Sequence, residues 1–180
     1  DAQLKVLLEL VNKLGSSVKI SFSPGEFYAT KDIGTLTPIL AHTHVLFANE
    51  KEVEQLTGKD FKTGAEICLN LGCHIVVVTL GKGTIWKTVM ATSYIRNSQG
   101  EYVVEPVNKE IISDQDTIGA GDAFASGFLY GLLKGKVLKE CGRLGDIAAR
   151  FSITKTGARQ GLPTLNQLSQ RCQELYNKEL

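Results

Sequence analysis

Apolar and polar positions follow two different rhythms along this 180-residue chain, and together they predict alternating helices and strands. Leucine and valine recur at helical spacing over residues 4–14. The run His74–Leu80 is apolar on both faces, which is typical of an interior parallel strand. Shorter β-rich runs predict strands at 18–22, 45–48, 85–88, 92–96 and 102–104, and helical patterns predict helices at 37–41, 49–56, 63–72, 123–133, 137–155 and 164–176.

This alternation indicates the fold class. Strands that alternate with helices predict an α/β protein with three layers, α/β/α, around a mainly parallel central sheet. Ligands of such sheets bind beyond the carboxyl ends of the strands. Asn49, Gly81 and Gly119 each follow a predicted strand, so we expect their loops to share one edge of the sheet.

Composition narrows the class of protein. The apolar fraction of 43% is enough for a core, and the net charge of +1 with scattered Lys and Arg gives no footprint for nucleic acid. No apolar run approaches the length of a membrane span, and the chain opens without a signal peptide. These features predict a cytoplasmic protein that binds neither nucleic acid nor membrane.

Cysteine and histidine do not predict a metal centre. None of the four cysteines forms a Cys-x-x-Cys pair, so free buried thiols are expected. His42 and His44 stand two positions apart, but no cysteine or carboxylate cluster completes a ligand set around them.

The segment Asp-Thr-Ile-Gly-Ala-Gly-Asp at residues 116–122 runs directly into a predicted helix. Free amide groups at a helix start, together with the positive end of the helix dipole, make a site for an anion. Asp122 lies at the rim of that site, where a carboxylate can take the proton of an attacking alcohol. The segment predicts phosphoryl transfer to a hydroxyl group; a glycine-rich turn with two capping aspartates is the alternative.

Three further segments carry weaker signals. Asn49 and Glu52 are typical of a capped, acidic first helical turn, and the same oxygens could bind hydrated Mg²⁺. Thr79 and Gly81 follow the most apolar strand, where glycine permits close approach of a ligand, although a tight hairpin would use the same residues. Gly157 is consistent with a helix C-cap.

These segments resemble motifs of the PfkB, or ribokinase-like, family of carbohydrate and nucleoside kinases. Residues 116–122 resemble its Asp-Thr-x-Gly-Ala-Gly-Asp signature, and residues 49–58 resemble its Asn-x-x-Glu motif with a trailing Leu-Thr-Gly. Residues 79–84 resemble its Thr-Leu-Gly-x-x-Gly nucleotide loop, with the second glycine one position early. Gly157-Ala158 is similar to the segment that closes the base pocket and completes a cation site.

The resemblance implies ATP-dependent phosphoryl transfer to a hydroxyl of a sugar or nucleoside, with Mg²⁺ and a monovalent cation such as K⁺ as cofactors. It implies that Asp122 is the general base and that the amides of Gly119, Ala120 and Gly121 form the anion hole. The implied nucleotide contacts are Asn49, Thr79, Gly81, Gly121 and Gly157, and the implied metal-binding residues are Glu52 and Asn49 for Mg²⁺ and Asp116 for the monovalent cation.

The resemblance covers only the later, C-terminal part of a family member. No Gly-Gly sugar site, acidic acceptor-binding residue or β lid is found, so we expect an incomplete ribokinase-like fold without its early strands. Residues 1–180 are then the nucleotide-binding and catalytic part of a single ribokinase-like domain, cut from a longer protein. The exposed sheet edge predicts self-association. A non-catalytic nucleotide-binding fragment and a kinase for a vitamin-type alcohol remain alternatives.

Overall fold

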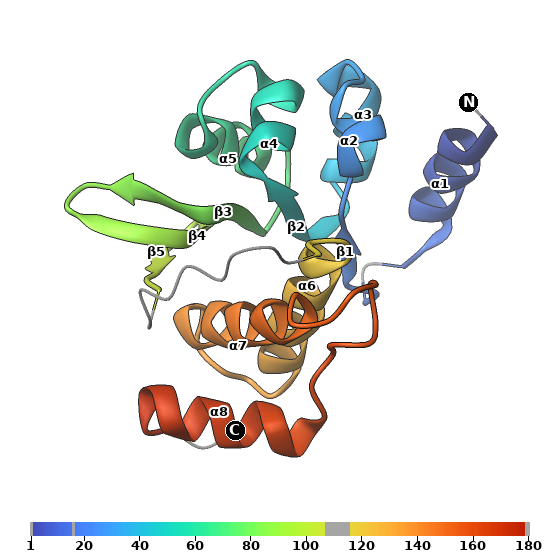
Figure 1. Cartoon of the computed structure of the whole chain (residues 1–180). Helices are drawn as coiled ribbons and strands as arrows, with labels where there is room; N and C mark the ends of the chain where they lie inside the picture. The colour runs from blue at the N-terminus through green and yellow to red at the C-terminus, as the bar shows by residue number, and fades with distance from the viewer. Residues whose placement is uncertain (1, 16, 107–115, 179–180) are drawn as a thin grey trace. The chain divides into compact units, whose positions relative to one another are not determined.

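The structure is a computed structural model that describes residues 2–15, 17–106 and 116–178. Contacts group the chain into two compact units. Figure 1 labels the helices and strands along the chain. Unit 1 comprises Asp1–Thr79 and Tyr94–Glu101, and unit 2 comprises Leu80–Ser93 and Tyr102–Leu180. The boundaries between the two units fall inside strands of the sheet, so the sheet contributes residues to both units.

Unit 1 is built on the parallel strands of the sheet. β1 pairs in parallel with β2, and β2 pairs in parallel with β3, with Val45 opposite Ile75 and Asn49 opposite Thr79. Valine, leucine and phenylalanine fill the centres of β2 and β3 and are buried, as the apolar run predicts. The elements of this unit are α1 (Ala2–Lys13), β1 (Ile20–Phe22), α2 (Gly25–Ala29), α3 (Ile33–Leu40), β2 (Thr43–Asn49), α4 (Glu50–Thr57) and α5 (Phe61–Asn70).

The sheet has the order β1-β2-β3-β4-β5. β3 (Ile75–Trp86), β4 (Val89–Asn97) and β5 (Gly100–Val104) follow one another through two-residue links, and such links join antiparallel strands. The predicted α/β class, with parallel strands followed by antiparallel ones, is confirmed. The antiparallel strand β4 is longer than predicted, and the predicted strand at 85–88 is part of β3.

The three helices α6 (Ala120–Leu133), α7 (Leu138–Ser152) and α8 (Leu165–Tyr176) belong to unit 2. α6 and α7 approach backbone to backbone: a Cβ atom on Gly127 would lie 2.5 Å from the Leu144 carbonyl oxygen. On the other helix, a Cβ atom on Gly145 would lie 2.8 Å from the Phe124 carbonyl oxygen. α8 packs on α7 through Leu168 and other apolar side chains.

Several local predictions were wrong at helix starts. Helix α2, with Pro24 at its N-cap, is absent from the predicted helices. α3 begins at Ile33 instead of residue 37 and contains Pro38. α5 begins at Phe61 because the Asp60 side chain accepts hydrogen bonds from the amides of Lys62 and Thr63, so the cap precedes the predicted start.

The expectation for the cysteines is met. The four cysteines are free and buried, and burial raises the pKa of the Cys68 and Cys141 thiols to about 11. None of the helices that the structure describes is both long enough and apolar enough to cross a membrane.

Candidate active site

The 116–122 segment leads into α6 through a turn in which position 119 must be glycine. Gly119 caps the helix in the left-handed region, with φ +79°. A Cβ atom on it would lie 2.9–3.0 Å from the Cβ, Cα and carbonyl oxygen of Ala158. The amide of Ala120 donates to the Thr117 carbonyl at 3.1 Å. Gly119 is therefore required by packing, and the Ala120 amide is already part of the turn.

Gly121 and Asp122 follow as the second and third residues of α6, and both are exposed. Amides in this first turn have no partner within the helix. A Cβ atom on Gly121 would meet no atom within 4 Å. The packing of this structure thus gives no reason for glycine at 121, and an open stretch of backbone lies beside the Asp122 carboxylate.

Asp116 joins this segment to the loop after α7. Its Oδ1 accepts from the Ile118 amide at 3.0 Å, and its Oδ2 accepts from the Gly157 amide at 2.7 Å. These two bonds, the Ile118 bond first, hold the pKa of Asp116 below its ordinary value. The structure therefore brings together two residues that the sequence placed in separate motifs, and it uses Asp116 as a clamp between two loops.

Asn49 and Glu52 form a reciprocal cap at the start of α4 in unit 1. The Asn49 Oδ1 accepts from the Glu52 amide, and the Glu52 Oε2 accepts from the Asn49 amide, both at 2.9 Å. This is a capping box. The predicted helix cap is confirmed. The other carboxylate oxygen of Glu52, Oε1, lies outside the box.

Thr79 lies opposite Asn49, the last residue of β2, so these two predicted nucleotide contacts are neighbours where the parallel pairing of β2 and β3 ends. Gly81 differs from its prediction. It lies inside β3, with φ +58° and no atom within 4 Å of a Cβ position, because the strand continues through the glycines to Trp86. An isolated glycine after a buried run indicated a loop, whereas neighbouring strands keep the segment extended.

The candidate residues divide between the two units. Unit 1 carries Asn49, Glu52 and Thr79, whereas unit 2 carries Gly81, Asp116, Gly119–Asp122 and Gly157. Sequence reasoning missed the Asp116–Gly157 bond and the Gly119–Ala158 contact, since neither leaves a local signal. Among the residues that the structure describes, no group of three or more His, Cys, Asp or Glu side chains could hold a metal ion.

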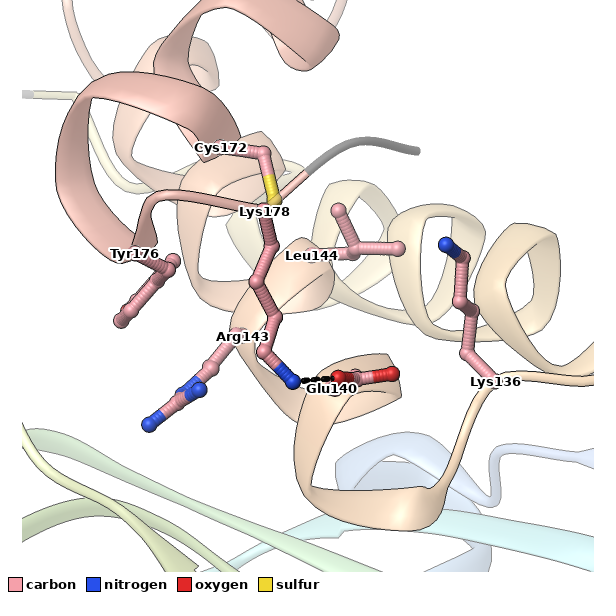
Figure 2. A pocket seen from close by; sticks show the side chains of 7 residues that line it. All are labelled: Lys136, Glu140, Arg143, Leu144, Cys172, Tyr176 and Lys178. Carbon is pink, nitrogen blue, oxygen red and sulfur yellow. Dashed lines mark hydrogen bonds and ion pairs between the residues drawn. The ribbon is translucent and has the colours of Figure 1, made fainter.

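Figure 2 shows a pocket in unit 2 that contains none of the candidate site residues. Its volume is about 20 Å³, which suits a water molecule. The Arg143 guanidinium lies 4.4 Å from the centre of the Tyr176 ring, and Lys178 pairs with Glu140. The Tyr176 hydroxyl is buried without a hydrogen-bond partner among the described residues. The pocket is lined by Lys136, Glu140, Arg143, Leu144, Cys172, Tyr176 and Lys178.

Comparison with known proteins matches this chain to one kinase family. Residues 26–165 match the pfkB family of carbohydrate kinases. An uncharacterized sugar kinase of Archaeoglobus fulgidus is 44% identical over 144 residues, which are 80% of this chain and 53% of the relative. A cytidine kinase of Thermococcus kodakarensis is 36% identical over 155 residues, 83% of this chain and 52% of the relative.

Among solved structures, the nucleoside kinase of Methanocaldococcus jannaschii, an archaeal member of the ribokinase family, superposes with a TM-score of 0.75 at 24% identity. The match covers 95% of this chain and 53% of that one. The predicted ribokinase-like fold is confirmed. The chain spans about half the length of the curated relatives it matches. Because the family match runs through most of the sequence, including the start of α6, this chain belongs to the pfkB family of carbohydrate kinases.

Proposed function

We propose that the protein transfers the γ-phosphoryl group of ATP to a hydroxyl group of a sugar or nucleoside. The observation that carries the proposal is the open first turn of α6. Gly121 leaves the backbone uncovered there, and the exposed Asp122 carboxylate follows directly. A site that needed only a helix cap would have no use for either feature.

The proposal gives a role to each residue of the turn. The amides of Gly121 and Asp122, with the positive end of α6, would stabilise the negative oxygens of the transferring group. The Asp122 carboxylate would accept the hydroxyl proton as the new oxygen–phosphorus bond forms and the bond to ADP breaks. Gly119 would fix the turn, since a side chain there collides with Ala158. Ala120 would shape the turn through its bond to Thr117.

The remaining candidate residues fit a nucleotide and its cations. Asn49, Thr79, Gly81 and Gly157 are proposed nucleotide contacts. Mg²⁺ prefers to keep several waters and one or two carboxylates, and the uncapped Oε1 of Glu52 beside Asn49 meets that requirement. When bound, Mg²⁺ neutralises charge on the phosphates. Asp116 is the proposed side-chain ligand of a monovalent cation, because a carboxylate that accepts two amides still has lone pairs.

Replacement of Asp122 tests the proposal. The Asp122→Asn variant should bind MgATP like the parent chain, measured by isothermal titration calorimetry, since asparagine keeps the size of the side chain. Acceptor-dependent release of ADP, measured over a panel of sugars, nucleosides and vitamin-type alcohols, should fall about 10²-fold or more, the scale of general-base catalysis.

Three outcomes discriminate the alternatives. Equal turnover by Asp122→Asn and the parent would contradict the assignment of the base. Turnover with only a vitamin-type alcohol would change the acceptor class. Saturable MgATP binding without turnover of any acceptor would favour a non-catalytic nucleotide-binding fragment.

A further inference from the structure

The fold pairs two histidines that are thirty positions apart in the sequence. His44 is the second residue of β2, and His74 immediately precedes β3. The strands pair in parallel with Val45 opposite Ile75, and the His74 amide donates to the Thr43 carbonyl at 3.2 Å. The two histidines therefore lie side by side at the amino ends of the strands, whereas Asn49 and Thr79 lie where the parallel pairing of the two strands ends.

The two rings have a spacing that suits a shared ion. Their centres are 5.1 Å apart and their planes are inclined by 45°. Imidazole nitrogens lie about 2.0–2.1 Å from Zn²⁺, so two rings that share a tetrahedral ion have centres roughly 5 Å apart. His74 is exposed and His44 is half-buried, which leaves the pair open to solvent on one side.

The third histidine, His42, has a local backbone contact instead of a second histidine beside it. His42 is exposed, and its Nδ1 lies 2.8 Å from the Pro38 carbonyl oxygen, so it closes a local turn of its own helix end. Within the described ranges, no hydrogen bond engages the ring of His44 or His74. The Cys73 thiol, which precedes His74, is buried and donates to the Leu40 carbonyl, so it is not part of the pair.

We propose that His44 and His74 form a two-histidine site for a divalent transition-metal ion such as Zn²⁺, with water completing the coordination. Imidazole ligands suit zinc, copper and nickel, whereas Mg²⁺ selects oxygen ligands, so this site is independent of the proposed nucleotide cation. A bound ion would join β2 to β3 at their amino ends and stabilise the sheet by mass action.

A small anion is the competing ligand, because Lys19 is near enough to act electrostatically on His44. The ring spacing favours the metal. One lysine supplies a single positive charge, whereas two adjacent imidazoles offer the nitrogen ligands that suit a divalent transition metal.

The test uses untagged protein, a non-chelating reductant and excess Mg²⁺, and it titrates ZnCl₂ calorimetrically. The parent chain and the His42→Ala control should bind one Zn²⁺ with the same affinity. His74→Ala should bind at least about tenfold more weakly, since loss of even an outer-shell partner costs 10–100-fold. The buried thiols are the same in all variants, so a difference in Zn²⁺ affinity reports the contribution of the histidine rings.

A second readout and a second variant keep the test decisive. Addition of Zn²⁺ should shift the imidazole NMR resonances of His44 and His74 and leave those of His42 in place, and His44→Ala, checked for fold by circular dichroism, should repeat the loss. Equal affinity in parent and His74→Ala, or no binding by the parent, would overturn the proposal. Binding of inorganic phosphate that needs His74, without binding of Zn²⁺, would replace it with an anion site.

Discussion

Gly119 and Gly121 lie two positions apart at the start of α6, and a side chain on each would meet opposite surroundings. At Gly119 it would collide with the backbone of Ala158, and the left-handed φ adds strain. At Gly121 it would meet open space on a helical backbone. The first glycine therefore maintains the turn, whereas the second leaves room for something outside the chain. Under the proposed function, that room belongs to the phosphate groups of ATP.

This contrast gives a prediction for Gly121→Ala. The thermal unfolding midpoint should stay the same or rise slightly, because alanine favours helix over glycine. The affinity for MgATP should fall about tenfold, or 1.4 kcal/mol, because the added methyl group occupies the phosphate position. Calorimetric titration measures the affinity, and Ser126→Ala, an exposed position of the same helix, is the control that should bind normally. Unchanged affinity in Gly121→Ala would contradict a phosphate site at this turn.

At the scale of elements, regular patterns were predicted well and irregular ones were not. α1, α8 and the core of β2 and β3 fall within about two residues of their predicted ranges, because long periodic runs carry a strong signal. β3 runs on through Gly81 and Gly83, whose local signal indicates a loop, since pairing with β4 outweighs local preference. The Asn49–Glu52 cap needed no tertiary information, because both of its bonds are local.

The contact between α6 and α7 gives the prediction at this scale. Gly127→Ala places a methyl group 2.5 Å from the backbone oxygen of Leu144, and a backbone cannot rotate away as a side chain can. The helices must separate, so the free energy of unfolding should fall by about 1–3 kcal/mol. Urea unfolding measures it. Gly121→Ala is the matched control, with the same substitution in the same helix and no neighbour. Equal stability of the two variants would show that the helices are less closely packed than described.

For the whole molecule, the sequence supports the family and the fold, while the site is predicted only piece by piece. Motifs predict Asn49, Thr79 and Asp122 individually, because Asn49 and Asp122 lie at the start of a helix and Thr79 follows a long apolar run. The Asp116–Gly157 clamp depends on loops far apart in the sequence, and so does the His44–His74 pair. In the sequence, His44 is close only to His42. The register between β2 and β3, which places His44 beside His74, cannot be read from local patterns.

The sheet edge at β1 gives the last prediction. β1 has β2 as its one neighbour in the described sheet, and its residues Ile20–Phe22 carry no charge. The other edge, β5, holds Glu101, which accepts from the Tyr94 hydroxyl and lies 3.8 Å from the Lys62 Nζ. Uncharged edges pair with other copies and charged edges resist pairing, so self-association should proceed through β1.

Sedimentation velocity over roughly a 100-fold range of micromolar concentrations tests this prediction. The mean mass of the parent chain should rise with concentration. Ser21→Lys places a charge at an exposed position of β1 and should shift the equilibrium toward monomer, because pairing would bury the charge. Ser98→Lys, in the exposed link between β4 and β5, adds the same charge elsewhere and should associate like the parent. A monomer mass independent of concentration would contradict self-association, and equal effects of both lysines would mean that net charge, rather than the β1 edge, controls it.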